Sequence, residues 1–378
     1  MKITRIEVLH SKEPTILPIP WRAAWRGPKA TPITSFEFSF YKVYTDEGLV
    51  GYGPNTGYAD LGGLIGADPC YVEAFFDQHM SGRRSGNSGR GGAGIEIAMW
   101  DILGKAAGLP IHKLLGAMTD RVLVYAATSR LMEPEETAEH IEHIAELGFR
   151  AAKLRLHRPD PWDDVEVVEA VRDVVDDDFM ILVDANQNNV GEGYTFWSRR
   201  TAQRIAQALD DLDVYYLEEP LPRQDIEGLA DIAASVDMFI AGGEHTPTVY
   251  DFCEHLQRGA YDIIQPDVIL GGNYGITGVR RAAILADYYG RLIVPHVMSG
   301  AHFPLGIAAS LHVMASVENC PVLEFGFDPP ILTAETTQKV LKTPFMVEED
   351  GCVPVPQGAG LGVELDEEQL EVVTSFEG

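Results

Sequence analysis

The chain has 378 residues, of which 46% are hydrophobic, so it is long enough for one large domain with a smaller companion. Its 57 acidic and 29 basic residues give a formal net charge of −28, and such a chain lacks the clustered cations that bind nucleic acid. No apolar run approaches the roughly 18 residues that a membrane span requires, and the N-terminus lacks the apolar centre of a signal peptide. The four cysteines form no CxxC pair, which argues against a disulfide framework or a zinc–thiolate site. We therefore expect a cytoplasmic protein with neither nucleic-acid nor membrane partners.

Residues 1–118 are expected to form an α+β domain. The stretch at 35–53, SFEFSFYKVYTDEGLVGYG, is typical of two strands joined by a turn, and helical patterns follow around 71–82 and 94–108. Rigid prolines flank two tryptophans and two arginines in PIPWRAAWRGP at 18–28. We expect this last segment to be a loop that closes over a binding site, although its tryptophans could instead be ordinary packing between two domains.

The sequence pattern changes near residue 119, where short β-rich runs begin to alternate with amphipathic helical patterns. The eight β-rich runs are VLVYAAT, AAKLRLH, MILVDAN, VYYLEEP, MFIAGGE, YDIIQPDV, LIVPHV and VLEFGF. Eight strands separated by helices at about thirty-residue spacing predict an α/β fold, a (β/α)8 TIM-type barrel over 119–340. A doubly wound sheet is the second alternative, but no GxGxxG turn supports a nucleotide site. Residues 341–378 contain no further repeat, and we expect them to return to the N-terminal capping domain and complete it.

Successive predicted strands end in polar and mostly ionisable side chains. Asp184, Glu218 and Glu244 follow three adjacent strands, whose carboxyl ends meet at one mouth of a barrel. Three carboxylates at one mouth would repel each other strongly unless a cation lay between them. All-oxygen ligands favour Mg²⁺, with Mn²⁺ as an alternative, and the lack of a histidine or cysteine in the set argues against zinc. The competing interpretation is that the three acids pair separately with arginines. Glu219 is not counted as a ligand, because a strand would turn it to the opposite face.

Two further residues suggest proton transfer at the same mouth. Asp267 follows one predicted strand in IIQPDV, and His296 follows the next in VPHV. A carboxylate beside an imidazole fixes the tautomer of the ring and raises its basicity. His296 is therefore the candidate general base, with Asp267 as its partner.

Lys153 and Arg155 lie two positions apart in AAKLRLH, so a strand would point both cations the same way. Together with the residues above, they give a series of motifs along the chain: KxR, DAN, EEP, GE, a QPD aspartate, a PH histidine and, near the C-terminal end of the barrel, an LEF glutamate. This combination resembles the enolase superfamily, and within it the mandelate racemase subgroup. The resemblance covers almost the whole chain, from the capping domain through the barrel to the C-terminal return.

The resemblance implies a site and a chemistry. It assigns Mg²⁺ to the three acids named above, and it assigns the removal of a proton beside a carboxylate to His296 with Asp267. It implies that Glu324 hydrogen-bonds the developing enediolate, and Lys153 would add a cation to the same oxygens. Relatives of this kind are commonly symmetric assemblies, so we expect a homo-oligomer that acts on a small molecule.

Arg155 departs from the family pattern. Many members carry a lysine here, which works as a second base on the opposite face of the substrate, whereas arginine does not readily lose its proton. A one-base reaction is easier to build, in which His296 takes the α-proton and a β-hydroxyl leaves as water. We therefore expect a Mg²⁺-dependent dehydratase of a sugar acid, an aldonate or aldarate, that forms a 2-keto-3-deoxy acid. Arg155 would anchor a substrate carboxylate or hydroxyls, or would simply balance nearby acids.

Four alternatives stay open. A racemase or epimerase of a 2-hydroxy acid or a related carboxylate would need a second base. A cycloisomerase would need a lysine pair, which Arg155 breaks. A metal-dependent hydrolase would normally show an HxH pair after the first barrel strand, which VLVYAAT lacks. A catalytically silent barrel is the last alternative, and it would have little use for so many ionisable groups at successive strand ends.

Overall fold

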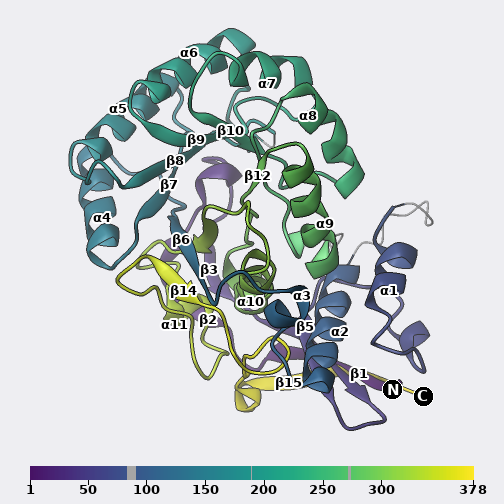
Figure 1. Ribbon diagram of the computed structural model, residues 1–378. Helices are drawn as coiled ribbons and strands as arrows, with labels where there is room; N and C mark the ends of the chain where they lie inside the picture. The colour runs from purple at the N-terminus through teal and green to yellow at the C-terminus, as the bar shows by residue number, and fades with distance from the viewer. Residues whose placement is uncertain (83–90, 189, 271–273) are drawn as a thin grey trace.

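Two sheets organise the chain, an antiparallel one in the cap and a curled parallel one in the barrel (Figure 1). The computed structural model describes residues 1–82, 91–188, 190–270 and 274–378. The predicted α/β fold is confirmed, with an N-terminal antiparallel sheet, a barrel-like parallel sheet and a C-terminal strand that returns to the cap. Within the described residues, no helix is both long and apolar enough to cross a membrane.

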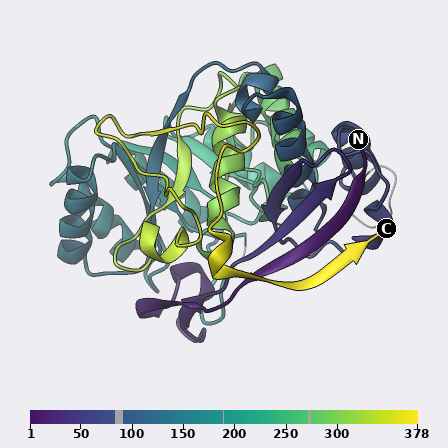
Figure 2. The ribbon, with the colours of Figure 1, turned by 90° about the horizontal axis from the view of Figure 1, so that it is seen from below.

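The cap sheet has the strand order β15-β1-β4-β5, with every neighbouring pair antiparallel. Its strands are β1 (Ile3–Ser11), β4 (Ser39–Thr45), β5 (Val50–Pro54) and β15 (Leu370–Glu377). The first and last strands of the chain therefore lie side by side, as Figure 2 shows in purple and yellow. A separate two-stranded ribbon precedes β4 and consists of β2 (Thr15–Trp21) and β3 (Ile33–Phe36).

Among the described residues of the cap there are three α-helices: α1 (Val72–His79), α2 (Gly92–Ala107) and α3 (Ile111–Leu115). Helix α2 approaches β5 so closely that a Cβ on Gly53 would lie 1.8 Å from the carbonyl oxygen of Gly94. Only glycine permits this backbone contact. On its other side, α2 buries the carboxylate of Glu96, which accepts hydrogen bonds from the backbone N–H groups of Ile276 and Thr277, each at 2.9 Å. Glu96 thus caps a helix of the barrel and fixes the cap to it.

The eight predicted barrel strands are all present and parallel, in the order β12-β11-β10-β9-β8-β7-β6-β13. They are β6 (Arg121–Ala127), β7 (Ala151–Arg155), β8 (Met180–Asp184), β9 (Val214–Glu218), β10 (Phe239–Gly242), β11 (Ile263–Ile264), β12 (Leu292–Ile293) and β13 (Leu323–Gly326). A short strand, β14 (Cys352–Pro354), adds to β6 in the antiparallel sense.

Helices connect these strands and cover the outside of the sheet (Figure 1). They are α4 (Pro134–Glu146), α5 (Pro161–Arg172), α6 (Arg199–Asp210), α7 (Ile226–Ala233), α8 (Phe252–Arg258), α9 (Gly275–Tyr288) and α10 (Phe303–Met314), and the short α11 (Ala334–Thr337) follows β13. Several begin with a defined cap; for example, the Ser198 side chain accepts from the backbone N–H of Thr201 at the start of α6.

A small apolar cluster fills the interior of the barrel. Its fully or nearly fully buried members are Tyr125, Ala127, Ala151, Leu182, Tyr216, Ala241, Ile263, Val294 and Val322. Side chains alternate along a strand, so the residue two positions further on points into the same interior, one layer closer to the mouth. That rule places a polar layer directly above the apolar one, and the candidate site is built there.

Candidate active site

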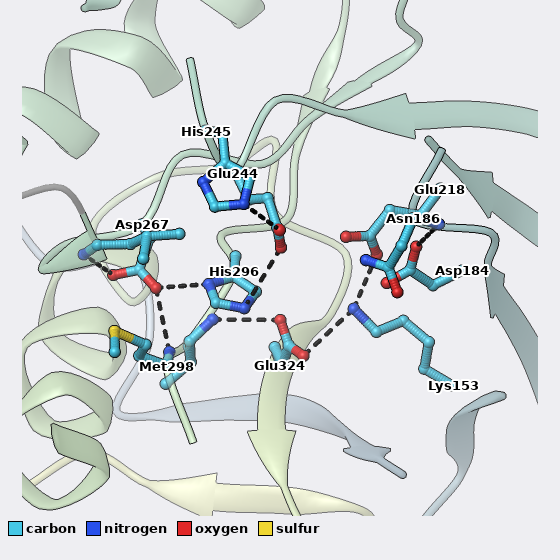
Figure 3. A network of polar contacts seen from close by, with 12 residues as sticks. Lys153, Asp184, Asn186, Glu218, Glu244, His245, Asp267, His296, Met298 and Glu324 are labelled. Atoms are coloured by element: carbon cyan, nitrogen blue, oxygen red, sulfur yellow. Dashed lines mark hydrogen bonds and ion pairs between the residues drawn. The ribbon is translucent and has the colours of Figure 1, made fainter. Parts of the chain in front are cut away.

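The polar layer follows from the apolar one by strand alternation. Lys153, Asp184, Glu218, His296 and Glu324 each stand two positions after a member of the apolar cluster. Glu244 stands three positions after Ala241, because Gly243 intervenes with a φ of 110°, a conformation that favours glycine. The predicted site residues therefore come together at one end of the barrel (Figure 3).

Each proposed metal-binding acid is paired with a cation or an imidazole. Arg155 Nη1 forms an ion pair with Asp184 Oδ2, and Lys153 Nζ lies 2.7 Å from Glu218 Oε2. Glu244 lies 3.1 Å from His245 and 3.4 Å from His296. Among the described residues, no three His, Cys, Asp or Glu side chains already converge as a formed metal site.

The charge in this layer nevertheless favours a divalent cation. Six carboxylates, all buried except for the slightly exposed Glu244, face two basic side chains: the acids are Asp184, Glu218, Glu219, Glu244, Asp267 and Glu324, and the bases are Lys153 and Arg155. Burial, and after it the charge of Glu218, raises the pKa of Asp184 to about 7. Glu218 Oε1 is buried without a hydrogen-bond partner in the described part of the chain. These oxygen donors and the excess of negative charge fit a hard cation such as Mg²⁺.

Asp267 and His296 form the pair that the sequence predicts. His296 Nδ1 lies 2.6 Å from Asp267 Oδ2, and Asp267 also accepts from the backbone N–H groups of Ile269 and Met298. Burial opposes protonation of the ring, yet the surrounding carboxylates, Glu244 foremost, raise the pKa of His296 to about 10. The aspartate is thus held rigidly, and it orients Nε2 of the imidazole toward Glu244 (Figure 3).

Lys153 and Glu324 link the metal-binding side of the site to the imidazole. Lys153 is fully buried and lies 3.2 Å from Glu324 Oε1 as well as beside Glu218. Glu324 Oε2 accepts from the backbone N–H of Val297, next to the histidine. Burial by itself would raise the pKa of Glu324, but Lys153 and His296 hold it below its usual value. Both residues therefore lie between Glu218 and the backbone beside His296.

Arg155 lies beneath the cap segment at 18–28. Its Nε donates to the carbonyl of Thr128 at 2.8 Å, and the ring of Trp25 lies 4.5 Å from its guanidinium carbon. This geometry is a cation–π contact. The predicted loop is in part the end of β2 and in part a 3-10 turn, Ala24–Arg26.

Three hydrogen bonds hold this segment against the barrel. Trp21 Nε1 donates to Ser129 Oγ at 2.9 Å, and the backbone N–H of Ala24 donates to the carbonyl of Ser129 at 2.8 Å. The hydroxyl of Tyr194 donates to the carbonyl of Ala24 at 3.0 Å. Trp21 therefore packs between the cap and the barrel, whereas Trp25 contacts Arg155, a predicted site residue.

Glu219 was excluded from the predicted site because side chains alternate along a strand, but it does not lie in a strand. The strand ends at Glu218, and Glu219 has a φ of 47°, so the side-chain direction expected of a strand does not apply. It is fully buried, and neither carboxylate oxygen has a hydrogen-bond partner within the described ranges. Burial, and after it the charge of Glu244, raises the pKa of Glu219 well above its usual value. Glu219 thus belongs to the acidic cluster, a position that the sequence did not reveal.

Besides His296 and His245, a further histidine, His157, lies next to the site beside Asn186, and the predicted site residues did not include it. It lies two positions beyond Arg155, so the alternation in AAKLRLH could have identified it. Its Nε2 lies 2.8 Å from Asn186 Oδ1, and its ring stacks on Tyr194 with centroids 5.2 Å apart. Burial lowers the pKa of His157 to about 4, so the imidazole is neutral near pH 7.

Comparison with known proteins identifies the family of the chain. Residues 22–116 match the N-terminal domain of mandelate racemase / muconate lactonizing enzyme, and residues 136–369 match the enolase C-terminal domain-like family. The chain is 34% identical to the 3,6-anhydro-alpha-L-galactonate cycloisomerase of Streptomyces coelicolor, covering 82% of this chain and 81% of that one. It is 30% identical to the D-galactonate dehydratase of Pectobacterium atrosepticum, covering 90% and 93% respectively.

A solved structure extends the agreement to three dimensions. The crystal structure of a racemase from Streptomyces coelicolor with bound magnesium superposes with a TM-score of 0.79 at 28% identity, covering 97% of this chain and 98% of that one. The resemblance inferred from the sequence motifs is thereby confirmed. The chain belongs to the enolase superfamily and, within it, to the mandelate racemase / muconate lactonizing subgroup.

Proposed function

We propose that this protein is a Mg²⁺-dependent dehydratase of a sugar acid, an aldonate or aldarate, that forms a 2-keto-3-deoxy acid. The observation that carries the proposal is the Asp267–His296 pair, whose imidazole faces a buried acidic cluster across the barrel mouth. A base beside oxygen donors of this kind suits the removal of a proton next to a carboxylate, since that step places a second negative charge on the substrate. The similarity to a galactonate dehydratase over most of both chains supports the same reaction.

The proposed cation would be held by Asp184, Glu218 and Glu244. When bound, Mg²⁺, or Mn²⁺ in its place, supplies positive charge that offsets the charge developing on the substrate carboxylate. The rest of the chemistry belongs to the side chains of this chain.

With the charge of Glu244 offset by the cation that it would hold, the main cause of the raised pKa of His296 is removed, and the imidazole is unprotonated. In the proposed reaction, His296 Nε2 takes the proton from C2 while Asp267 holds Nδ1. The electron pair of the broken C–H bond passes into the enediolate, where Lys153 and Glu324 stabilise the new charge. The C3–O bond then breaks, the leaving hydroxyl takes a proton from the His296 imidazolium, and water departs. The resulting enol becomes the 2-keto acid by losing the proton of its C2 hydroxyl and gaining one at C3. Arg155, under Trp25, is proposed to anchor the far carboxylate or hydroxyls of the substrate.

Two other reactions on the same scaffold have support of their own. A cycloisomerase is favoured by one comparison, since the chain is 34% identical to a 3,6-anhydro-alpha-L-galactonate cycloisomerase over 82% of its length. A racemase or epimerase is favoured by one observation, the further histidine, His157, beside Asn186. All three reactions share the removal of the α-proton and differ in the fate of the enediolate.

The test is a screen of the purified protein with Mg²⁺ against mono- and diacid sugars, with 2-keto acid detected as its semicarbazone. The variant His296→Asn serves as the catalytic control, and the exposed Glu254→Gln serves as a matched surface control. Keto acid from one stereochemical group, lost in His296→Asn and kept in Glu254→Gln, would support the proposal. Ring-opened or ring-closed isomers without keto acid would favour a cycloisomerase, and α-proton exchange alone would favour a racemase.

A further inference from the structure

Two histidines, His296 and His157, belong to different sides of the site. His296 and Asp267 lie at one side of the site, and Asn186 lies at the other, beside Asp184 and Glu218 (Figure 3). His157 is hydrogen-bonded to that asparagine. Because His157 Nε2 lies 2.8 Å from Asn186 Oδ1, His157 belongs to the Asn186 side of the site, away from His296 (Figure 3).

The hydrogen bond to Asn186 sets the tautomer of His157. An amide oxygen only accepts, so Nε2 of the ring carries the proton and donates it to Asn186 Oδ1. Nδ1 is left with its lone pair, and it has no hydrogen-bond partner in the described part of the chain. This nitrogen is not fully enclosed, so it keeps contact with solvent although only 5% of the residue is exposed.

The surroundings hold the ring in one orientation. Tyr194 stacks on it with an interplanar angle of 25°, and the hydroxyl of Tyr194 is bonded to the cap segment at Ala24. The backbone N–H of Asn186 donates to Asp184 Oδ1 at 2.8 Å, so the asparagine is itself held by the acidic cluster. The neighbouring guanidinium of Arg155 opposes a positive charge on this imidazole. A neutral, oriented imidazole with one free lone pair can accept a proton.

We propose that His157 is a second base, which takes the C2 proton from the face of the substrate opposite His296. This inference rests on the proposed function. It replaces the family's second lysine, absent at Arg155, with a histidine two positions further along the same strand. In this step, Nδ1 of His157 takes the C2 proton, the C–H electron pair enters the enediolate, and the imidazolium returns a proton or deuteron to C2. The protein would therefore act on both C2 epimers of its substrate.

The test measures the loss of the C2 proton by NMR in D₂O with Mg²⁺, whether by exchange or by dehydration. The substrates are C2-epimeric pairs of sugar acids, such as gluconate with mannonate and galactonate with talonate. For each pair, the ratio of the two epimers' rates is compared among the wild type, His157→Gln and His296→Asn. Glutamine suits position 157 because its amide can still donate to Asn186 but cannot take up a proton.

We expect the wild type to act on both epimers of one pair. His157→Gln should shift the ratio of the two rates by at least tenfold, and His296→Asn should shift it at least tenfold in the opposite direction. Tyr194→Phe, which keeps the stacked ring and loses only the hydroxyl, should change both rates by a similar factor. If His157→Gln does not fold, His296→Asn still tests the inference: retained activity toward a single epimer would support His157 as the second base, and loss of activity toward both epimers would contradict it.

Two results would overturn the inference: wild-type action on one epimer only, or an equal loss for both epimers in His157→Gln, which would mark a merely structural role. Keto acid is measured in the same samples, so the inference and the proposed function fail separately. Exchange of the C2 proton in both epimers without keto acid would contradict the proposed dehydratase function and support His157 as a second base. Keto acid from one epimer, with no reaction of the other, would support the dehydratase function and contradict His157 as a second base.

Discussion

Asp267 and His296 are neighbours just beyond the ends of β11 and β12, where an isolated parallel bridge joins their backbones and a 2.6 Å hydrogen bond joins their side chains. Two backbone N–H groups bind the other oxygen of the aspartate, at 2.6 and 2.9 Å, so the carboxylate has little freedom to turn. The pairing therefore depends on the sheet and not on a flexible loop.

Replacing the aspartate should impair catalysis while preserving the fold. In Asp267→Asn, the amide keeps the shape of the side chain but cannot stabilise the imidazolium, and it favours the wrong tautomer. We expect kcat for keto-acid formation to fall by roughly 10²- to 10⁴-fold, with the thermal unfolding temperature little changed. Steady-state kinetics beside the surface variant Glu254→Gln check this. A kcat within threefold of the wild type would show that the pair is only structural.

Metal removal tests the acidic cluster. Treatment with EDTA should abolish keto-acid formation, and added Mg²⁺ or Mn²⁺ should restore it. Asp184→Asn should weaken Mn²⁺ binding, followed by electron paramagnetic resonance, by at least about tenfold, whereas the exposed Asp173→Asn should leave it unchanged. Full activity after exhaustive chelation, or equal Mn²⁺ affinity in both variants, would refute the proposed cation site.

Lys153 should matter for stability as well as for chemistry. It is fully buried between Glu218 and Glu324, so Lys153→Met leaves buried carboxylates without a counter-charge. We expect the free energy of unfolding in EDTA to fall by about 3–5 kcal/mol. The exposed pair of Lys29 and Glu192 is a suitable control, and Lys29→Met should cost no more than about 1 kcal/mol. Urea denaturation measures both, and equal losses would contradict the assigned role.

A buried histidine pair between cap and barrel should make stability depend on pH. His112 and His312 are fully buried with their Nδ1 atoms 3.2 Å apart, and burial lowers the pKa of His312 to about 4. The folded state therefore favours the neutral ring, so this contribution is complete above the unfolded pKa of about 6.5 and is lost as the pH falls toward 4. The loss for His312 amounts to about 3 kcal/mol.

The variant His312→Asn isolates this contribution, because all other titrating groups are shared with the wild type. Urea unfolding between pH 4 and pH 7 should show a shallower decline of stability in the variant. Parallel curves for the two proteins would mean that the histidine pair does not drive the dependence.

Much of the fold could be read from local pattern. The eight β-rich runs coincide with β6–β13, because apolar alternation and helical spacing are properties of short segments. The same alternation placed Lys153, Asp184, Glu218 and Glu324 in one layer, since each follows an inward apolar residue by two positions. Where the backbone leaves the strand conformation, the rule does not apply: Glu219 has a φ of 47°, so alternation does not fix the direction of its side chain.

Other features needed the tertiary structure. Trp25 rests on Arg155 across 130 positions of sequence, and His157 meets Asn186 only because β7 and β8 are neighbours in the sheet. Alternation along a single strand indicates which side of the sheet a residue faces, but not which partner lies opposite it.

The amino-acid sequence by itself determined the order of strands and helices, the inward position of most site residues and the family to which the chain belongs. These depend on short-range periodicity and on motifs within single strands. Only the tertiary structure decided which cation meets which carboxylate, which barrel residues hold the segment at 18–28, and that His157 is hydrogen-bonded to Asn186. Such contacts join segments far apart in the chain, and they are set by how the sheet curls and how the cap packs on it.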